Sequence, residues 1–359
     1  MAITTQTEIA GPVNVVYQTE LLRRAQALCP YFVGSKPGEL RSHSGTFTVK
    51  WRRYEHLTPT TTPLAEITGS VVFPTRTAVQ PSVTDITATV QKYGQFIFLN
   101  EEVDLVNINR VAMELTGVLG ENAGRSLNRL QRNELEDNST SILAGAATTA
   151  SSIGATQFVS RTLLSRVVNE LQRQDAMKFL AMTRGSQNIG TAPVRESFWA
   201  FCHPDTEEDL RTLTGFNSVE TYAGQTETEI GEIGHVGGIR FIATTESTID
   251  AGSGATVTST ATISGRETSN RGDLYNTVVI GKEFHGSLGL DATHVKTAYR
   301  PEDRLPAVMM INHAKGSGGV ADPLNEIASV GWKTWHAAKI LNANWGRVVK
   351  HTASKLTAA

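Results

Sequence analysis

The residues best able to do chemistry form an acidic group near the middle of the chain. Asp205, Glu207, Glu208 and Asp209 follow His203 within six positions, and clustered carboxylates can hold a metal ion. The same residues have a simpler role, because Asp205 and Glu208 have the spacing of a helix capping box. Acidic side chains in a first helical turn also suit the positive end of the helix dipole. We therefore expect a helix start here and not a metal site.

Other patterns that carry chemistry each lack a required part. Gly281-Lys282 ends like a phosphate-binding loop, but Glu283 occupies the hydroxyl position and the upstream glycine is missing. The Gly-x-Ser-x-Gly elbow of hydrolases does not occur. The nine histidines are scattered without the spacing of metal ligands. We expect no catalytic residue, no metal and no cofactor. A soluble enzyme stays as the weaker hypothesis, since it would need polar residues that converge in a pocket.

Composition excludes several broad classes. The chain has 359 residues, of which 40% are hydrophobic and 19% charged, enough for one large or two ordinary domains. Its formal net charge is −2, and it lacks the basic stripe that tight binding to nucleic acid requires. Two cysteines are too few for a disulfide framework. No apolar run approaches the roughly 20 residues that cross a bilayer. We expect a soluble protein, made in a cytoplasm, with no membrane contact.

The most distinctive element is a segment rich in threonine and proline, residues 55–81, between two alternating strands. Val49 and Trp51 share one face of the first strand, and Ile86 and Ala88 repeat the alternation on the return. A structureless insertion of this length is uncommon inside a compact domain. An ordered ribbon that projects from a body has few contacts with its own subunit. We therefore expect it to contact a neighbouring subunit, in a protein that assembles.

A long helix is the next strong signal, over residues 108–137. Its apolar positions step by three or four residues: Val111, Leu115, Val118, Leu119, Ala123, Leu127 and Leu130. At ~1.5 Å per residue such a helix is about 40 Å long. One apolar stripe buries a helix against one layer. Its opposite, arginine-bearing face is therefore left to water or to another subunit.

Charged residues on the ribbon and on this helix are candidates for contacts between subunits. Two interpretations remain open. Exposed ion pairs on a solvated surface contribute only ~0–1 kcal/mol, whereas pairs across an interface fix register and specificity. The candidates are Arg52, Arg53, Glu55, Glu66, Arg76, Arg125, Arg129 and Arg132.

Shorter elements fill the remainder of the chain. Ser160 precedes a second amphipathic helix and is a suitable cap. Apolar strands are predicted at 194–201, 238–244 and 274–280. Three of the five tryptophans lie within 330–351, so we expect this C-terminal segment to pack into a core.

Six segments carry a resemblance to a known family: GTFTVKWRRY at 45–54, FLNEE at 98–102, FCHPD at 201–205, DPLN at 322–325, VGWK at 330–333 and AAKILN at 337–342. With the order of elements described above, the chain resembles the major capsid proteins of tailed double-stranded DNA bacteriophages, which have the Hong Kong 97-like fold. Within that group it is similar to the coliphage N-four type. The resemblance covers almost the whole chain, and it rests on order and spacing because no single motif is diagnostic.

The resemblance implies an α+β fold with four parts. These are an N-terminal arm (1–40), an extended β-hairpin loop (41–83), a peripheral domain with the spine helix (84–138 and 301–359), and a mixed-sheet axial domain (139–300).

It also implies a function and partners. Copies of the chain would form hexamers and pentamers of an icosahedral head and enclose packaged double-stranded DNA without binding it specifically. A separate scaffolding protein and a portal at one vertex are the expected partners, and a decoration protein is an option. The expected location is the virion, assembled in the host bacterial cytoplasm. The alternative is another phage structural protein, such as a tail tube, fibre or adhesion protein. The long helix disfavours it, since fibres favour short repeated β units.

Overall fold

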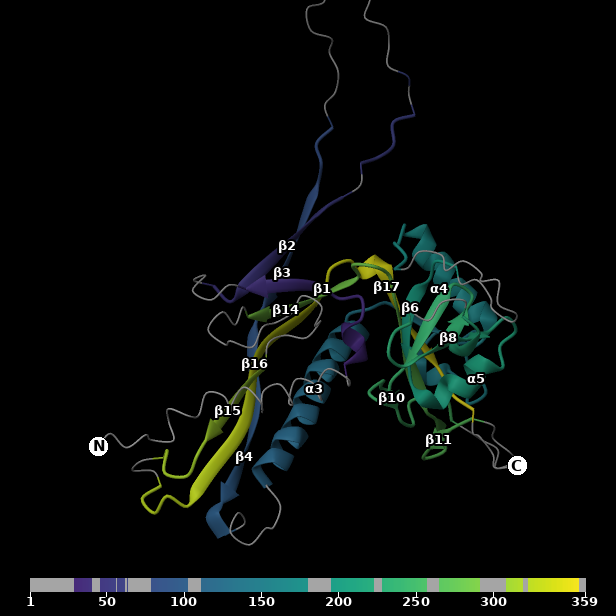
Figure 1. The fold of residues 1–359 in the computed structure, drawn as a ribbon. Coiled ribbons are helices and arrows are strands. Elements are labelled where there is room, and N and C mark those ends of the chain that lie inside the picture. The colour runs from purple at the N-terminus through teal and green to yellow at the C-terminus, as the bar shows by residue number, and fades with distance from the viewer. Residues whose placement is uncertain are drawn as a thin grey trace, which may run out of the picture.

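Two β-sheets and one long helix organise the protein (Figure 1). This computed structural model describes residues 29–40, 46–55, 57–61, 63, 79–102, 111–179, 195–222, 228–256, 265–290, 308–318 and 322–354. The strands are β1 (Lys36–Leu40), β2 (Thr48–Tyr54), β3 (Val83–Thr89), β4 (Gln91–Asn100), β5 (Ser141–Leu143), β6 (Phe198–Cys202), β7 (Asn217–Ser218), β8 (Glu232–Val236), β9 (Ile239–Ala243), β10 (Ile249–Asp250), β11 (Glu267–Thr268), β12 (Arg271–Gly272), β13 (Leu274–Ile280), β14 (His285–Leu290), β15 (Val308–His313), β16 (Ile327–Ile340) and β17 (Gly346–His351). The α-helices are α3 (Val111–Asp137), α4 (Arg161–Arg173) and α5 (Glu207–Arg211).

The first sheet is long and has five strands. Its order is β1-β14-β16-β15, and β4 pairs with β16 as well. The 14-residue β16 is its central strand, antiparallel to β4 over 327–336, to β15 over 329–334 and to β14 over 336–340. A continuous strand of this length gives the sheet the elongated form seen in Figure 1.

The helix α3 lies along one face of the long sheet and confirms the predicted helix over its described part. Leu119 and Leu127 are buried and pack in one cluster with Val330 of β16. Val118, which the sequence pattern placed in the same stripe, is 55% exposed, so that part of the prediction was wrong. The contact stripe is narrower than the apolar pattern because the helix meets a single layer.

The second sheet has eight strands in the order β5-β17-β13-β6-β9-β8-β7, with β10 also paired to β13. Every residue of β13 is buried, as the predicted apolar strand at 274–280 leads one to expect, and the burial includes the polar Asn276 and Thr277. The predicted strand at 238–244 is confirmed as β9, while the one at 194–201 begins later, as β6. The helix α4 packs into the core of this sheet, and Ser160 caps it by accepting a hydrogen bond from the Leu163 N–H at 3.2 Å.

A hydrophobic cluster joins the two sheets. Tyr31, Leu135, Phe201 and Phe284 are fully buried in it and come from segments far apart in sequence. The chain also crosses between the sheets, because β14 pairs with β16 in the long sheet and β17 pairs with β13 in the other. A division at residue 300 therefore does not follow the boundary between the sheets: β14 precedes it and β17 follows it.

Asp205 does not cap a helix as the sequence predicted. Asp205 lies within a 3-10 turn, Pro204–Thr206, that immediately precedes α5. His203 caps this turn, because its Nδ1 accepts a hydrogen bond from the Asp205 N–H at 3.1 Å. The Asp205 carboxylate instead accepts from the Tyr275 hydroxyl at 2.8 Å and lies 3.1 Å from the Arg266 guanidinium. The predicted capping box was wrong because partners distant in sequence occupy this carboxylate.

Candidate assembly surface

The hairpin of β2 and β3 confirms the two predicted alternating strands. It is an antiparallel pair from Thr48–Thr89 to Tyr54–Val83, and it forms a sheet of its own. Trp51 on its inner face packs in one cluster with Leu288 and Trp335 of the long sheet. The base of the hairpin therefore rests on its own subunit, contrary to the expectation that such a ribbon finds few contacts there.

The chain leaves the body beyond β2. Residues 57–61 are exposed, and Figure 1 shows them leading away from both sheets. Two candidate residues farther along, Glu66 and Arg76, lie outside the described residues. Arg52 makes two hydrogen bonds with the Asp85 carboxylate on β3, from Nε at 2.9 Å and from Nη2 at 3.2 Å. The hydrogen bond from Arg52 lowers the pKa of Asp85. Arg52 is thus paired within its own hairpin.

Arg53 and Glu55 fix the direction of the hairpin. Arg53 donates from Nε and Nη2 to the Glu55 carboxylate, at 2.9 and 2.6 Å, and Thr84 on β3 donates to the same oxygen at 2.7 Å. The remaining Nη1 of Arg53 donates to the Leu341 carbonyl at 3.0 Å. Leu341 lies just after β16, so this bond ties the hairpin to the point where the chain passes from one sheet to the other.

The three candidate arginines of α3 converge on one residue of the eight-stranded part. Arg125 and Arg129 donate from Nε to the two carboxylate oxygens of Glu246, at 2.6 and 2.5 Å. Arg132 donates from Nη1 to the Glu246 backbone carbonyl at 2.6 Å and bonds Asn133 with its other nitrogens. The structure therefore brings these three together, as a clamp between the helix and the second sheet.

Glu246 carries a negative charge in a largely enclosed position. Only 7% of its side chain is exposed, whereas Arg125 and Arg129 are 54% and 53% exposed. Burial opposes ionisation of Glu246, but the hydrogen bonds from Arg129 and Arg125 outweigh it and lower its pKa. The Nη groups of both arginines make no hydrogen bond with the described residues.

The long sheet also has an exposed apolar side. Residues directly opposite one another in antiparallel strands share a face, and Ile97 and Val330, opposite each other, both pack toward α3. Phe96 and Phe98 alternate with Ile97 and therefore point to the other face, where they are 63% and 66% exposed. Their rings meet edge to face with centroids 5.1 Å apart. The hairpin rests on this same face, through Trp335.

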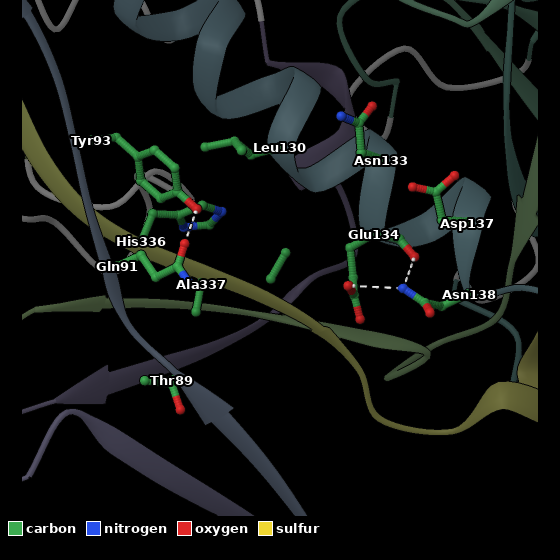
Figure 2. Close-up of a pocket in the computed structure, with 11 residues that line it drawn as sticks. Thr89, Gln91, Tyr93, Leu130, Asn133, Glu134, Asp137, Asn138, His336 and Ala337 are labelled. Atoms are coloured by element: carbon green, nitrogen blue, oxygen red, sulfur yellow. Dashed lines mark hydrogen bonds between the residues drawn. The ribbon is translucent and has the colours of Figure 1, made fainter.

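A pocket of about 300 Å³ lies between the C-terminal half of α3 and the strands β4 and β16 (Figure 2). Tyr93 donates to Gln91 at 3.1 Å and Asn138 donates to Glu134 at 3.0 Å within its wall. Burial lowers the pKa of His336, which also lines it, to about 4, so this imidazole is neutral at pH 7. These two pairs bond within the wall, whereas neither ring nitrogen of the buried His336 has a hydrogen-bond partner among the described residues. In the described part of the chain, no group of three or more side chains has the arrangement of a metal site.

Sequence reasoning missed Glu246, Phe96 and Phe98. No local signal marks Glu246, because its arginine partners lie 117 and 121 positions away. The two phenylalanines stand in an apolar run, 96–99, that reads equally well as a buried strand. Alternation of apolar and polar residues would have indicated which face of the strand is exposed to solvent, but Ile97 and Leu99 are apolar as well, so the pattern gives no such indication.

Among the described helices, none is long and apolar enough to cross a membrane.

Comparison with protein families gives a match over most of the chain. A family model described as phage capsid protein matches residues 83–351, which extends from β3 to the end of β17. No protein of curated function matches the sequence.

Solved structures with a similar fold come from several phage heads. The capsid of Ralstonia phage GP4 aligns with a TM-score of 0.59 and 11% identity, covering 92% of this chain and 93% of that chain. The capsid of cyanophage P-SCSP1u aligns at 0.52 with 13% identity, over 89% and 87%. The head of Helicobacter pylori bacteriophage KHP40 aligns at 0.50 with 9% identity, over 91% of both chains. At such low identities the likeness concerns the fold.

Proposed function

The chain belongs to the phage capsid protein family, and from this premise we propose that copies of it form the hexamers and pentamers of an icosahedral head around packaged double-stranded DNA. The fold is the mixed α+β, Hong Kong 97-like capsid fold, and the protein is the major capsid protein of a tailed phage, a virion component. The observation that carries the assembly proposal is the hairpin, whose base is anchored and whose continuation leads away from the body.

The proposed division of labour follows the four parts of the Hong Kong 97-like fold. Residues 84–138 and 301–359, with α3, are proposed as the peripheral domain, and 139–300 as the axial domain whose loops meet around the symmetry axes. The strands β14 and β17 each pair in the sheet of the other domain. Residues 1–40 serve as the N-terminal arm and 41–83 as the extended loop that lies over an adjacent subunit. Many such contacts per subunit give an avidity that no single contact has.

Charged side chains are proposed to set the register of these contacts. Arg52, Arg53 and Glu55 are held in fixed positions by bonds within their own subunit, which lowers the entropy cost of a further contact. Glu66 and Arg76 are proposed to act farther along the loop. On α3, the half-exposed side chains of Arg125 and Arg129 are proposed to meet a carboxylate of a neighbour, while Arg132 holds the clamp in place.

The finer assignments rest on the sequence. The similarity of the six short segments given in the sequence analysis supports the coliphage N-four type. We propose assembly in the host bacterial cytoplasm with a separate scaffolding protein and a portal at one vertex, and with a decoration protein as an option. The net charge of −2 fits a container that encloses DNA without gripping it. The capsid family supports a structural, non-enzymatic role. The family match decides against a tail tube, fibre or adhesion protein.

Deleting Thr58 to Val79 tests the assembly role of the loop. We expect a subunit with wild-type circular dichroism that forms no stable shells in negative-stain electron microscopy, because β2, β3 and their docking remain while the outward segment is lost. A second variant with a Gly/Ser segment of the same length keeps the connection but not the side chains, and it should fail in the same way. Normal shells from either variant would refute the role of this loop.

A further inference from the structure

Among the strands that the structure describes, β4 lies at an edge of the long sheet. It pairs with β16 along its whole length, from Gln91–His336 to Asn100–Ile327. In the part of the chain that the structure describes, no strand pairs with its other edge. Successive residues of an antiparallel strand turn their N–H and C=O groups alternately to the two sides, so about half of those of β4 point outward. A long, open edge of this kind is a template for pairing with another chain.

The face beside this edge is apolar. Phe96 lies opposite Gly331 of β16, where a Cβ would come within 2.8 Å of the Phe96 Cβ, so glycine leaves room for close approach there. Phe98 lies opposite Ser329, and neither partner is large enough to cover a phenyl ring. Singly exposed apolar residues are ordinary. Two adjacent rings more than 60% exposed on an unpaired edge are what a monomer avoids.

We propose that β4 is completed by an extended segment from a second copy of this chain, which pairs with its outer edge and covers Phe96 and Phe98. The inference rests on the proposed assembly and deepens it by naming the receiving surface. Main-chain hydrogen bonds along ten residues supply affinity, and the two rings supply the apolar centre of the contact.

Two observations favour a second copy as the occupant. The chain's own hairpin already rests on this face of the long sheet, through a cluster that includes Trp51, Leu288 and Trp335, so the face accepts an extended two-stranded element. The same hairpin carries exposed apolar residues of its own, Phe47 at 62% and Tyr54 at 67%. A neighbouring copy therefore offers both strand edges and apolar side chains of matching kind. A scaffolding or decoration protein on β4 is the competing outcome.

Hydrogen exchange read by mass spectrometry tests the pairing directly. The samples are the unassembled subunit and assembled shells from which any scaffolding or decoration protein has been removed. We expect the outward amides of β4 to exchange about 100-fold more slowly in the shell, because they gain hydrogen bonds there. The peptide of β13, already buried in the subunit, is the internal control and should be equally protected in both. Unchanged exchange in β4 on assembly, or protection that requires a second protein, would overturn the proposal.

A pair of substitutions tests the apolar centre. Phe96→Ser combined with Phe98→Ser should leave a folded subunit, since both rings are exposed, but raise the concentration needed for assembly by at least about tenfold. The matched control is Ile230→Ser, which removes a side chain that is 81% exposed in the turn before β8 of the other sheet. Assembly of the double variant at the wild-type concentration would refute the contact while leaving the shell function intact. Failure of the wild-type chain to form any particle, even with its scaffolding protein co-expressed, would instead refute the proposed function.

Discussion

Replacing Glu246 by glutamine should loosen the attachment of α3 to the eight-stranded sheet. The carboxylate joins Arg125 and Arg129 at 2.6 and 2.5 Å, and its side chain is only 7% exposed. Glutamine has nearly the same shape but a single acceptor oxygen. Its amide NH2 would therefore face one of the two guanidinium groups, donor against donor.

The size of the effect follows from burial. A hydrogen bond to a charged partner contributes about 1.5–3 kcal/mol. Both arginines are more than half exposed, so water screens them and each contribution falls toward the ~1 kcal/mol of an exposed pair. We expect Glu246→Gln to lower the free energy of unfolding by about 1–2 kcal/mol. Arg125→Gln alone should lower it by about half as much, since one of the two bonds remains.

Urea unfolding of the unassembled subunit measures the change at constant m value. Combining Glu246→Gln with Arg125→Gln and with Arg129→Gln should give non-additive losses, because the three residues share one carboxylate. The matched control is Glu207→Gln, which breaks an exposed pair with Arg211 at 2.7 Å and should cost at most about 0.5 kcal/mol. Strictly additive losses, or a loss in the control as large as in Glu246→Gln, would refute the reasoning.

The pH dependence of the same variant gives an independent test. Burial raises the pKa of Glu246, the arginines lower it more, and the net pKa lies below the ordinary value of about 4.3. A lowered pKa stabilises fully above the pKa of the unfolded chain, and the effect is lost as pH falls through the folded pKa. The stability difference between wild type and Glu246→Gln should hold from pH 7 to about 5 and shrink below about 4. A difference that grows on acidification would contradict this assignment.

Three further predictions concern the body of the subunit. Trp51→Ala should weaken docking of the hairpin by about 2 kcal/mol, roughly half the value for a fully buried tryptophan, and faster hydrogen exchange in β2 and β3 would show it; unchanged exchange would count against the docking. Burial lowers the pKa of His285, His336 and His351 to about 4, so the unfolded chain binds more protons than the native one between about pH 6.5 and 4. As the pH is lowered through this window, the free energy of unfolding should decrease by up to about 1.4 kcal/mol per pH unit for each histidine. His351→Gln should flatten that slope, and an unaltered slope would be the contrary result. Cys29 and Cys202 should resist thiol reagents in the folded subunit, because burial raises the pKa of both to about 12; rapid labelling without unfolding would contradict this.

The hairpin strands and α3 could be predicted from the sequence because their periodicity depends only on residues close to one another along the chain. Alternation at 46–51 and 86–91 is a property of neighbouring residues, and so is the three- and four-residue step of the long helix. The apolar pattern did not say how wide the contact would be, and Val118 stayed exposed since only one sheet lies beneath the helix. Elements with strong periodicity can therefore be predicted, whereas the extent of their contact depends on what they meet.

The hydrogen-bond partners of Asp205 and Glu246 could not be predicted from the sequence, because these partners are distant along the chain. Asp205 stood at the spacing of a capping box, yet Tyr275, 70 positions away, takes its carboxylate. Glu246 is a single acid in a polar loop, and only the arrangement of both sheets brings Arg125 to it. A carboxylate goes to whichever donor the tertiary fold places nearest, so spacing along the chain predicts its partner only where that fold supplies no competitor.

The exposed rings of β4 show how the same limit affects function. Residues 96–99 are all apolar, so the sequence offers no choice between a strand buried on both faces and a strand with one apolar face outward. The choice is made by α3, which covers Ile97 and leaves Phe96 and Phe98 on the far side. In a protein that remained a monomer, this run would call for a second covering layer from the same chain. In a shell subunit the layer can come from a neighbour, and a continuous apolar run that the described part of its own chain covers on one face only is then the signature of an assembly surface.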